Sequence, residues 1–203
     1  MPKNTKLSQR RSNGSLAFND LLFNVLVGFV MLFVIAFLLI NPPTKKEDVP
    51  SKAEVLIILE WEDEAADDVD LWVQRNNERP VGFSNKVVAP LHLDRDDLGW
   101  SNDRVVVDGQ VKIIRTNIET MTLRGNAPGN YYVSVHYYNQ VQDQVRYKVT
   151  VMKVNPFKQV YSVTGVLSSM REEQRLPAFT IDKDNMVTDV FNHARSVVMR
   201  GGG

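Results

Sequence analysis

The feature that most constrains this chain is an uninterrupted apolar stretch of 20 residues, Leu21 to Ile40. Asn24 carries the only polar side chain in it. A helix rises about 1.5 Å per residue, so this stretch would span roughly 30 Å, the thickness of a bilayer hydrocarbon core. A core helix of a globular protein keeps one polar face, and this stretch has none. We therefore predict a transmembrane helix over residues 16–41.

The charges on either side of this helix predict its orientation. The residues before Asp20 include four basic side chains and no acidic one, whereas the first charges after the helix are balanced. The positive-inside rule then places a basic tail, residues 1–15, in the cytoplasm and everything after the helix outside a bacterial inner membrane, in the periplasm. A cleavable signal peptide would have a shorter apolar region and a small-residue cleavage site. This run continues instead into Asn41-Pro42-Pro43-Thr44, so we expect an uncleaved anchor.

Asp20 stands at the cytoplasmic start of the apolar run, and Asn24 and Gly28 follow it at helical spacing. A carboxylate at the edge of a bilayer is costly unless it faces protein or water, which makes Asp20 a functional candidate. Gly28 would allow a second helix to approach closely. The alternative is an acidic residue that lies among the headgroups and interacts favourably with the helix dipole. Physical reasoning alone leaves both interpretations open.

The order of these features resembles the B-type subunits of ion-driven membrane motors, the MotB/ExbD/TolR group. The string Phe18-Asn19-Asp20-Leu21-Leu22 resembles the MotB pattern, in which aromatic-x-Asp precedes an apolar helix. The resemblance implies that Asp20, with Asn24 beside it, binds the translocated H⁺ or Na⁺. It also implies a homodimer, packed at Gly28, inside a ring of MotA/ExbB/TolQ-like multi-span subunits. The motif of the OmpA-like domain of MotB is absent, so the exported region is expected to be a different module.

Residues 42–52 combine proline and charge without periodicity and predict a linker. From 53 to 200, period-two alternation of apolar and polar residues predicts an antiparallel β-sandwich. Its expected strands are 54–61, 68–73, 86–93, 104–107, 111–115, 119–123, 131–137, 146–151, 158–167 and 178–181. Apolar residues at helical spacing predict a short C-terminal helix over 187–199. Residues 201–203 read as a cloning remnant.

Four strings in this domain resemble a known family: LEW at 59–61, DVDLWV at 68–73, LDRDD at 93–97 and APGNYYV at 127–133. Together they are similar to the YfaP-type β-sandwich domain of bacterial exported proteins. The resemblance implies a fold and export rather than an activity.

Acidic residues are concentrated in two segments of this domain. Residues 54–70 hold eight acidic residues and no Lys or Arg, and a second group follows at 94–97. Asp68 and Asp70 project from the same face of a strand. If the two segments meet, Asp68, Asp70, Asp94 and Asp96 would offer the hard oxygen ligands that Ca²⁺ prefers. The alternative is a solvated acidic rim that keeps an edge strand from pairing with other chains.

Composition excludes several other classes of protein. With 24 Lys+Arg and 24 Asp+Glu, the chain lacks the basic surplus of a nucleic-acid binder. It has no cysteine, so it can form neither disulfides nor thiolate sites. It shows no nucleophile elbow and no phosphate loop, so we predict that it is not an enzyme and requires no cofactor. Two functions remain: the motor subunit, and a membrane-anchored β-sandwich that binds Ca²⁺, sugar or protein, with the helix as a passive anchor.

Overall fold

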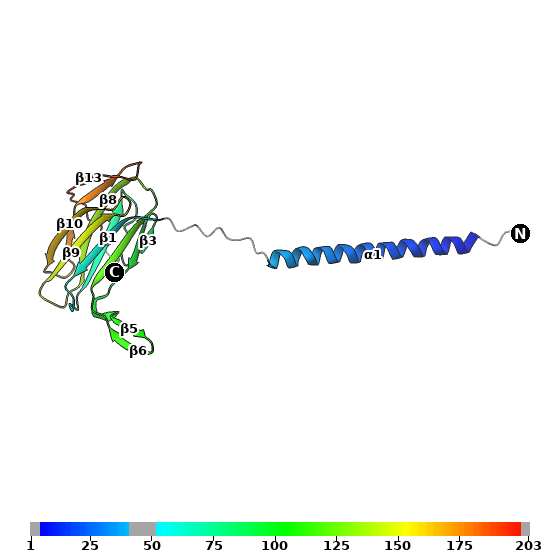
Figure 1. The fold of residues 1–203 in the computed structure, drawn as a ribbon, viewed down its shortest axis with the longest axis horizontal. Helices are drawn as coiled ribbons and strands as arrows, with labels where there is room; N and C mark the ends of the chain where they lie inside the picture. The colour runs from blue at the N-terminus through cyan, green and yellow to red at the C-terminus, as the bar shows by residue number, and fades with distance from the viewer. Residues whose placement is uncertain (1–4, 41–51, 200–203) are drawn as a thin grey trace. The chain divides into compact units, whose positions relative to one another are not determined.

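The computed structural model describes residues 5–40 and 52–199, which belong to two separate units (Figure 1). The first unit holds the N-terminal helix, and the second is a β domain. Apart from Lys52, the predicted linker lies outside the described residues, as does the predicted cloning remnant.

The first unit is a single helix, α1, Thr5–Ile40. It begins well before the predicted boundary at residue 16, so most of the basic segment is helical too. The part Ser15–Leu39 has a mean hydropathy of 2.8, and no side chain in its apolar window is buried. The helix is long and apolar enough to cross a membrane, a property that it shares with signal sequences.

The second unit consists of two antiparallel sheets and a hairpin. The six-stranded sheet has the order β10-β9-β1-β7-β4-β3. The other sheet has the order β11-β8-β12-β13, with β2 also paired to β8. The strands are β1 Ala53–Trp61, β2 Asp68–Arg75, β3 Val87–Val88, β4 Leu91–Arg95, β5 Arg104–Val107, β6 Gln110–Ile113, β7 Ile118–Arg124, β8 Gly129–Asn139, β9 Val145–Lys153, β10 Lys158–Leu167, β11 Glu173–Arg175, β12 Ala178–Ile181 and β13 Val187–Phe191, with a 3₁₀ turn, η1, at Gly99–Ser101.

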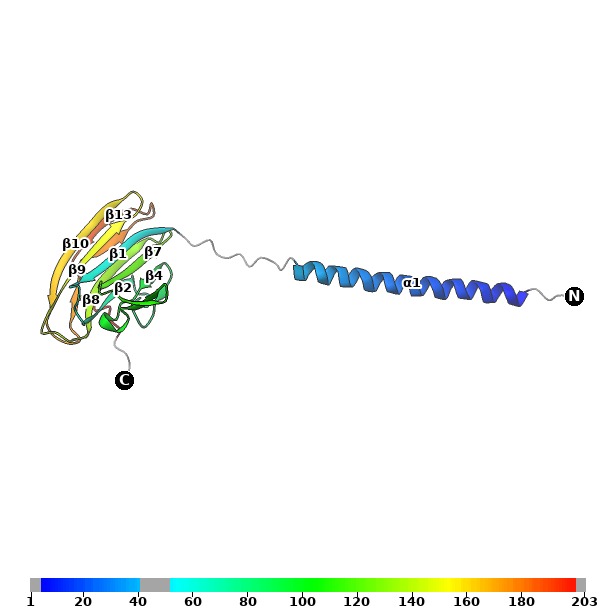
Figure 2. The same ribbon diagram turned by 60° about the horizontal axis from the view of Figure 1, so that its bottom comes forward.

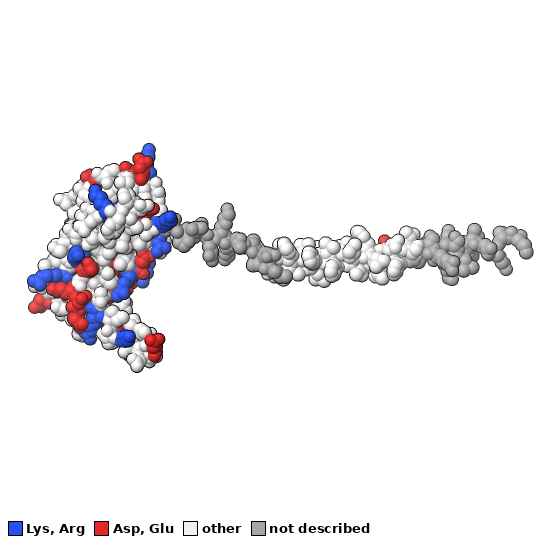
Figure 3. Space-filling model, viewed as in Figure 1, with Lys and Arg blue, Asp and Glu red and all other residues white. Residues whose placement is uncertain are grey.

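One apolar core lies between the two sheets, which form two layers (Figure 2). On β1 the alternating residues Val55, Ile57, Leu59 and Trp61 are buried, as the period-two pattern predicts. Strand β2 is buried on both faces, because Trp72 on its outer face packs edge-on against Phe83 at 5.5 Å between ring centroids. On the face shown in Figure 3, Lys and Arg are interspersed with Asp and Glu.

Strands β5 and β6 form a hairpin outside the two sheets (Figure 1). Asp108 and Gly109 both have positive φ, 53° and 75°, which is the geometry that a tight Asp-Gly hairpin turn requires. Its strands are largely exposed; Val106, for example, retains 68% of its accessible surface.

The prediction of a C-terminal helix over 187–199 is wrong. Residues 187–191 form β13, which pairs with β12, and residues 192–199 have no regular structure. The side chain of Asp182 accepts hydrogen bonds from the backbone N–H groups of Asp184 and Met186, which closes the β12–β13 turn. Phe179 then faces Val190 across the hairpin. Non-local strand pairing therefore overrides a local helical spacing, which short apolar patterns cannot distinguish from a strand.

Most predicted strands are confirmed, and three of them, 104–107, 158–167 and 178–181, have the predicted bounds. The segment predicted as one strand over 86–93 is instead two strands, β3 and β4, because Ala89 and Pro90 form a turn between them. Proline lacks the N–H group that a continuous strand needs for its hydrogen bonds.

Candidate functional site

The apolar part of α1 carries one acidic residue, Asp20. Helix geometry places Asn24 and Gly28 on the same face, about one and two turns further along. A Cβ atom added to Gly28 would meet no heavy atom within 4 Å. Packing among the described residues therefore gives no reason for the glycine, and this face is one that a second helix could approach closely.

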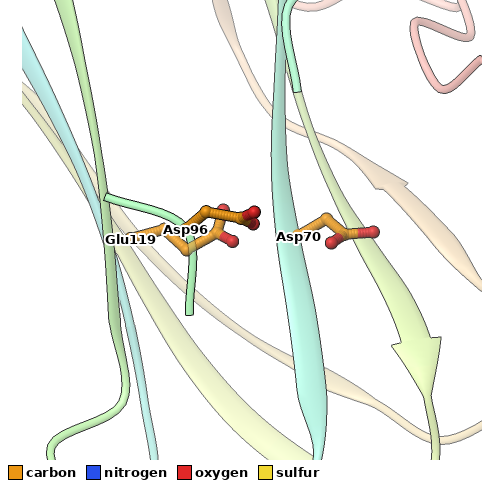
Figure 4. A group of neighbouring side chains, drawn as sticks. All are labelled: Asp70, Asp96 and Glu119. Carbon is orange, nitrogen blue, oxygen red and sulfur yellow. The ribbon is translucent and has the colours of Figure 1, made fainter. Parts of the chain in front are cut away.

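The second candidate site is a group of three carboxylates around β2 (Figure 4). Asp70 lies on β2, Asp96 just after β4, and Glu119 on β7. One carboxylate oxygen from each residue lies within 4.8 Å of the other two. Figure 4 shows Asp96 and Glu119 side by side, directed toward the strand that carries Asp70. Residues from three elements thus bring their negative charge to one place.

Glu119 is held by the backbone of two neighbouring segments. Its Oε2 accepts a hydrogen bond of 2.7 Å from the N–H of Leu71, and its Oε1 accepts one of 3.4 Å from the N–H of Asp97. Glu119 occupies an inward position in the same alternating row as Met121 and Leu123. The carboxylate therefore satisfies a backbone N–H of β2 and attaches that strand to the opposite sheet.

The segment that carries Asp96 is held by its own side chains and by a close backbone contact. Asn102 donates to the carbonyl oxygen of Asp96 at 3.1 Å and accepts from the N–H of Leu98 at 3.1 Å. Gly99 has a φ of 58°, and a Cβ atom there would lie 2.6 Å from the carbonyl oxygen of Ala66. The loop can therefore pack against the segment before β2 only with a glycine at this position.

Two basic side chains face the three carboxylates. Nδ1 of His136 lies 3.0 Å from Oδ2 of Asp70, and both side chains are buried. Nζ of Lys86 lies 2.8 Å from Oδ2 of Asp96, but the lysine side chain is 55% exposed. Oδ1 of Asp96 is enclosed and makes no hydrogen bond with a described residue.

Burial and mutual repulsion raise the pKa of three carboxyl groups, those of Glu119, Asp70 and Asp68. Burial raises the pKa of Glu119 well above its usual 4.5, and the charges of Asp70 and Asp96 raise it further. Burial also raises the pKa of Asp70, although the hydrogen bond from His136 opposes that shift. The pKa of Asp68 rises to about 7, because the residue is buried and lies near the charges of Asp70, Asp96 and Asp97. Positive charge at this place would therefore stabilise the ionised forms.

Most of the other acidic residues in the stretch 54–70 have partners of their own. Four glutamates form ion pairs with basic residues: Glu54 with Lys153, Glu60 with Lys148, Glu62 with Arg146 and Glu64 with Arg115. Oδ1 of Asp67 accepts hydrogen bonds from the hydroxyl of Tyr137 and from the N–H groups of Val141 and Gln142. These residues therefore support the fold, and Asp68 and Asp70 remain as candidates for binding.

The structure separates one of the four residues predicted to bind Ca²⁺ from the others. Asp70 and Asp96 lie together, and Asp68 lies near them. Asp94 instead accepts hydrogen bonds of 2.5 Å from Thr122 and from Arg124, with which it forms an ion pair. Asp94 lies at a register irregularity between Leu93 and Arg95, and Asp96 lies beyond the end of β4, so spacing along the chain does not predict a shared site.

Sequence reasoning missed Glu119 and the burial of His136. The signal for Glu119 was a charged residue in an inward position of an otherwise regular strand, which natural proteins place there only with compensation. His136 alternates with the core residues Val135 and Tyr137, which favours an outward position, but the residue is only 6% exposed. No local pattern could reveal that His136 lies opposite Asp70 on the neighbouring strand.

Comparisons with known proteins give a likeness of fold at most. No family model matches this chain, and no curated protein matches it. Among solved structures, the protein of unknown function SAV2460 is 15% identical, with a TM-score of 0.42, over 70% of this chain and 90% of its own. A domain of unknown function, DUF4425, from Bacteroides vulgatus is 14% identical, with a TM-score of 0.31, over 66% of this chain and 96% of its own.

Proposed function

We propose that this protein is a B-type subunit of an ion-driven membrane motor, with Asp20 binding the translocated H⁺ or Na⁺. In this proposal two copies of α1 form a homodimer inside a ring of MotA/ExbB/TolQ-like multi-span subunits. The observation that carries it is a lone carboxylate within a membrane-length helix, with no other charge in Ser15–Leu39. An ionisable residue is rare in such a segment, which makes Asp20 a candidate functional residue.

The face around Asp20 supports a dimer as well as an ion site. Asn24 adds a second oxygen-bearing side chain one turn along the helix, and Gly28 leaves the backbone open one turn further. Small residues allow transmembrane helices to approach closely, and polar side chains hydrogen-bond between them. A dimer packed on this face would bring the two Asp20 side chains toward each other.

The proposed orientation follows from the charges before the helix. Lys3, Lys6, Arg10 and Arg11 would stay in the cytoplasm, and the β unit would lie in the periplasm, anchored by an uncleaved helix in the inner membrane. Asp20 would then take up its ion from one side of the membrane and release it to the other along paths supplied by the partner ring. Repeated binding and release would drive rotation of the ring around the dimer, while the β unit holds the dimer in place.

Copurification from native membranes in a mild detergent tests the proposal. A tagged full-length chain should carry with it a protein with several transmembrane helices, in excess over two copies of the tagged chain. Gly28→Ile should lower the amount of multi-span protein that is recovered. A branched side chain on the dimer face keeps the two helices apart, and the ring is proposed to surround the dimer.

The control is Leu26→Ile, which places the same branched side chain on roughly the opposite face of the same helix. It should leave the complex intact. Recovery of the chain without a multi-span partner, or equal losses from the two substitutions, would contradict the proposal.

The second candidate function is a membrane-anchored binding module with α1 as a passive anchor. The carboxylate group of Asp70, Asp96 and Glu119 favours it, because these residues lie wholly within the β unit and do not involve the helix. A passive anchor has no use for Asp20, so Asp20→Asn separates the two functions: it should matter only in the motor.

A further inference from the structure

We propose that Asp70, Asp96 and Glu119 bind a divalent cation of the Ca²⁺ class, with Asp68 as an additional ligand. This proposal does not depend on the motor function, because its residues lie in the β unit. The three carboxylates come from β2, the segment after β4, and β7, and one oxygen of each lies within 4.8 Å of the other two; Asp96 and Glu119 approach β2 from one side, and Asp70 leaves it on the other (Figure 4). The name cation site below refers to these four residues.

Asp68 provides an observation independent of the three clustered carboxylates. It is only 7% exposed, and its enclosed Oδ1 makes no hydrogen bond with any described residue. It lies two residues before Asp70 on the same face of β2, and both side chains line one hollow together with Phe83, Ser101 and Tyr138. A buried carboxylate without a partner is costly, and Asp68 lies near the charges of Asp70 and Asp96, so a bound cation would stabilise it.

The positive charge that faces the cation site is too small to balance it. Four carboxylates are opposed by Lys86, which is half exposed, and by His136, which pairs with Asp70. The backbone of Leu71 adds one hydrogen bond, to Glu119. Arg171 also lines the hollow but forms no ion pair among the described residues. A bound divalent cation would supply the compensation that buried charges require.

The ligand atoms of the cation site favour Ca²⁺ over other divalent ions. Ca²⁺ binds oxygen at about 2.3–2.6 Å, so two ligands on opposite sides of the ion lie about 4.8 Å apart. The oxygens of Asp70, Asp96 and Glu119 lie within 4.8 Å of one another and could therefore surround Ca²⁺ with little movement. Mg²⁺ dehydrates reluctantly and usually keeps several waters, whereas Ca²⁺ accepts a site made of many protein oxygens. An all-oxygen site is also a poor choice for Zn²⁺ or copper, which prefer nitrogen and sulfur.

Binding would connect parts of the domain that are far apart in sequence. Asp70 belongs to one sheet and Glu119 to the other, and Asp96 begins the loop that leads into the exposed β5–β6 hairpin. The ion would add a link between the sheets to the existing Leu71–Glu119 hydrogen bond and would hold this loop against β2. The expected consequence is a higher melting temperature and a more rigid loop.

Thermal unfolding of the full-length protein in detergent tests the inference. All three tryptophans, Trp61, Trp72 and Trp100, lie in the β unit, so their fluorescence reports the unfolding of this unit alone. Ca²⁺ should raise the melting temperature in a saturable way, by about 5–10 °C at 100 times the dissociation constant. Mg²⁺ at the same concentration should do much less. Tb³⁺, a luminescent substitute for Ca²⁺, should be excited through Trp72, which is two residues from Asp70.

Three variants make the test specific. Asp70→Asn and Glu119→Gln keep the size of each side chain but lose its charge, so each should abolish the shift with Ca²⁺ and the Tb³⁺ luminescence. Asp94→Asn is the matched control: it removes an acidic residue two positions from Asp96, but one that pairs with Arg124, and it should keep both signals. Equal melting temperatures of the wild-type protein in Ca²⁺ and in chelator would overturn the inference. Loss of the response in Asp94→Asn to the same degree as in Asp70→Asn would also overturn it.

Discussion

The ion pair between Glu54 on β1 and Lys153 on β9 should contribute far more to stability than its neighbours. Nζ of Lys153 lies 2.5 Å from Oε2 of Glu54, and the exposed fractions of the two side chains are 4% and 19%. Asn185 donates a second hydrogen bond to the same oxygen at 2.7 Å. Glu54→Gln would leave a buried ammonium group without a counter-charge. Removing one partner of a buried pair costs about 3–5 kcal/mol, and the partial exposure of Glu54 favours the lower end, about 3 kcal/mol.

The same two strands provide a matched control. Glu60 and Lys148 also join β1 to β9, but they lie 3.6 Å apart and their side chains are about half exposed, at 49% and 53%. An exposed pair contributes about 0–1 kcal/mol. In urea unfolding followed by tryptophan fluorescence at pH 7, Glu54→Gln should lower the midpoint by about 1–2 M and Glu60→Gln by much less. Equal shifts from the two substitutions would refute this reasoning.

The contribution of Glu54 should also depend on pH. The hydrogen bond from Lys153 lowers the pKa of the Glu54 carboxyl below its usual 4.5. A carboxyl group whose pKa is lower in the folded than in the unfolded protein stabilises the folded state at any pH above its pKa in the unfolded protein. This contribution is lost as the pH falls through its pKa in the folded protein. The difference in stability between the wild-type protein and Glu54→Gln should therefore be full at pH 7 and shrink below pH 4.5. A difference that stays constant down to pH 3 would contradict the assignment.

Three further predictions concern other parts of the chain. A reporter enzyme that is active only in the periplasm should work when fused to the C-terminus, with the N-terminal helix still attached; cytoplasmic activity or a mature N-terminus near residue 42 would contradict the proposed topology. In urea unfolding, Asp67→Ala should lower the free energy of unfolding by about 3 kcal/mol, because it removes an acceptor shared by three donors. Tyr137→Phe removes only one of these donors and should lower it by about 1–2 kcal/mol. Equal losses from the two substitutions would be inconsistent with a shared acceptor. Gly99→Ala should lower the melting temperature by several degrees, because residue 99 has a positive φ and its Cβ atom would lie 2.6 Å from the carbonyl oxygen of Ala66. An unchanged melting temperature would be inconsistent with this loop geometry.

The strands of the sandwich could be predicted because their apolar alternation is local and long. The row Val55, Ile57, Leu59 and Trp61 reads directly as one buried face, and the structure buries all four. The C-terminal segment could not be predicted in the same way, since its few apolar residues fit both a helix and a strand. Pairing with β12 decided between them, and that pairing is not visible in the segment itself.

The carboxylate group could be predicted only in part, for a similar reason. Asp68 and Asp70 share a strand face by spacing alone, but spacing does not reveal which residues lie across from them. Glu119 reaches Asp70 because β7 packs beneath the edge strand β2, a contact between opposite sheets. Asp94 is turned away because it pairs with Arg124. Contacts of this kind depend on the three-dimensional arrangement of strands, which the pattern of one chain does not specify.

The most direct test of the proposed motor is ion flux through the purified complex. Membrane vesicles that contain the full-length chain and its copurified partner should take up H⁺ or Na⁺ along an imposed gradient, measured with an ion-sensitive dye. Asp20→Asn should leave the complex assembled but reduce the flux to the background of empty vesicles. The double substitution Asn19→Asp with Asp20→Asn keeps the composition and charge of the chain but moves the carboxylate about 100° around the helix, and it should not restore the flux. Wild-type flux in the Asp20→Asn complex would contradict the assignment of Asp20 as the ion-binding residue.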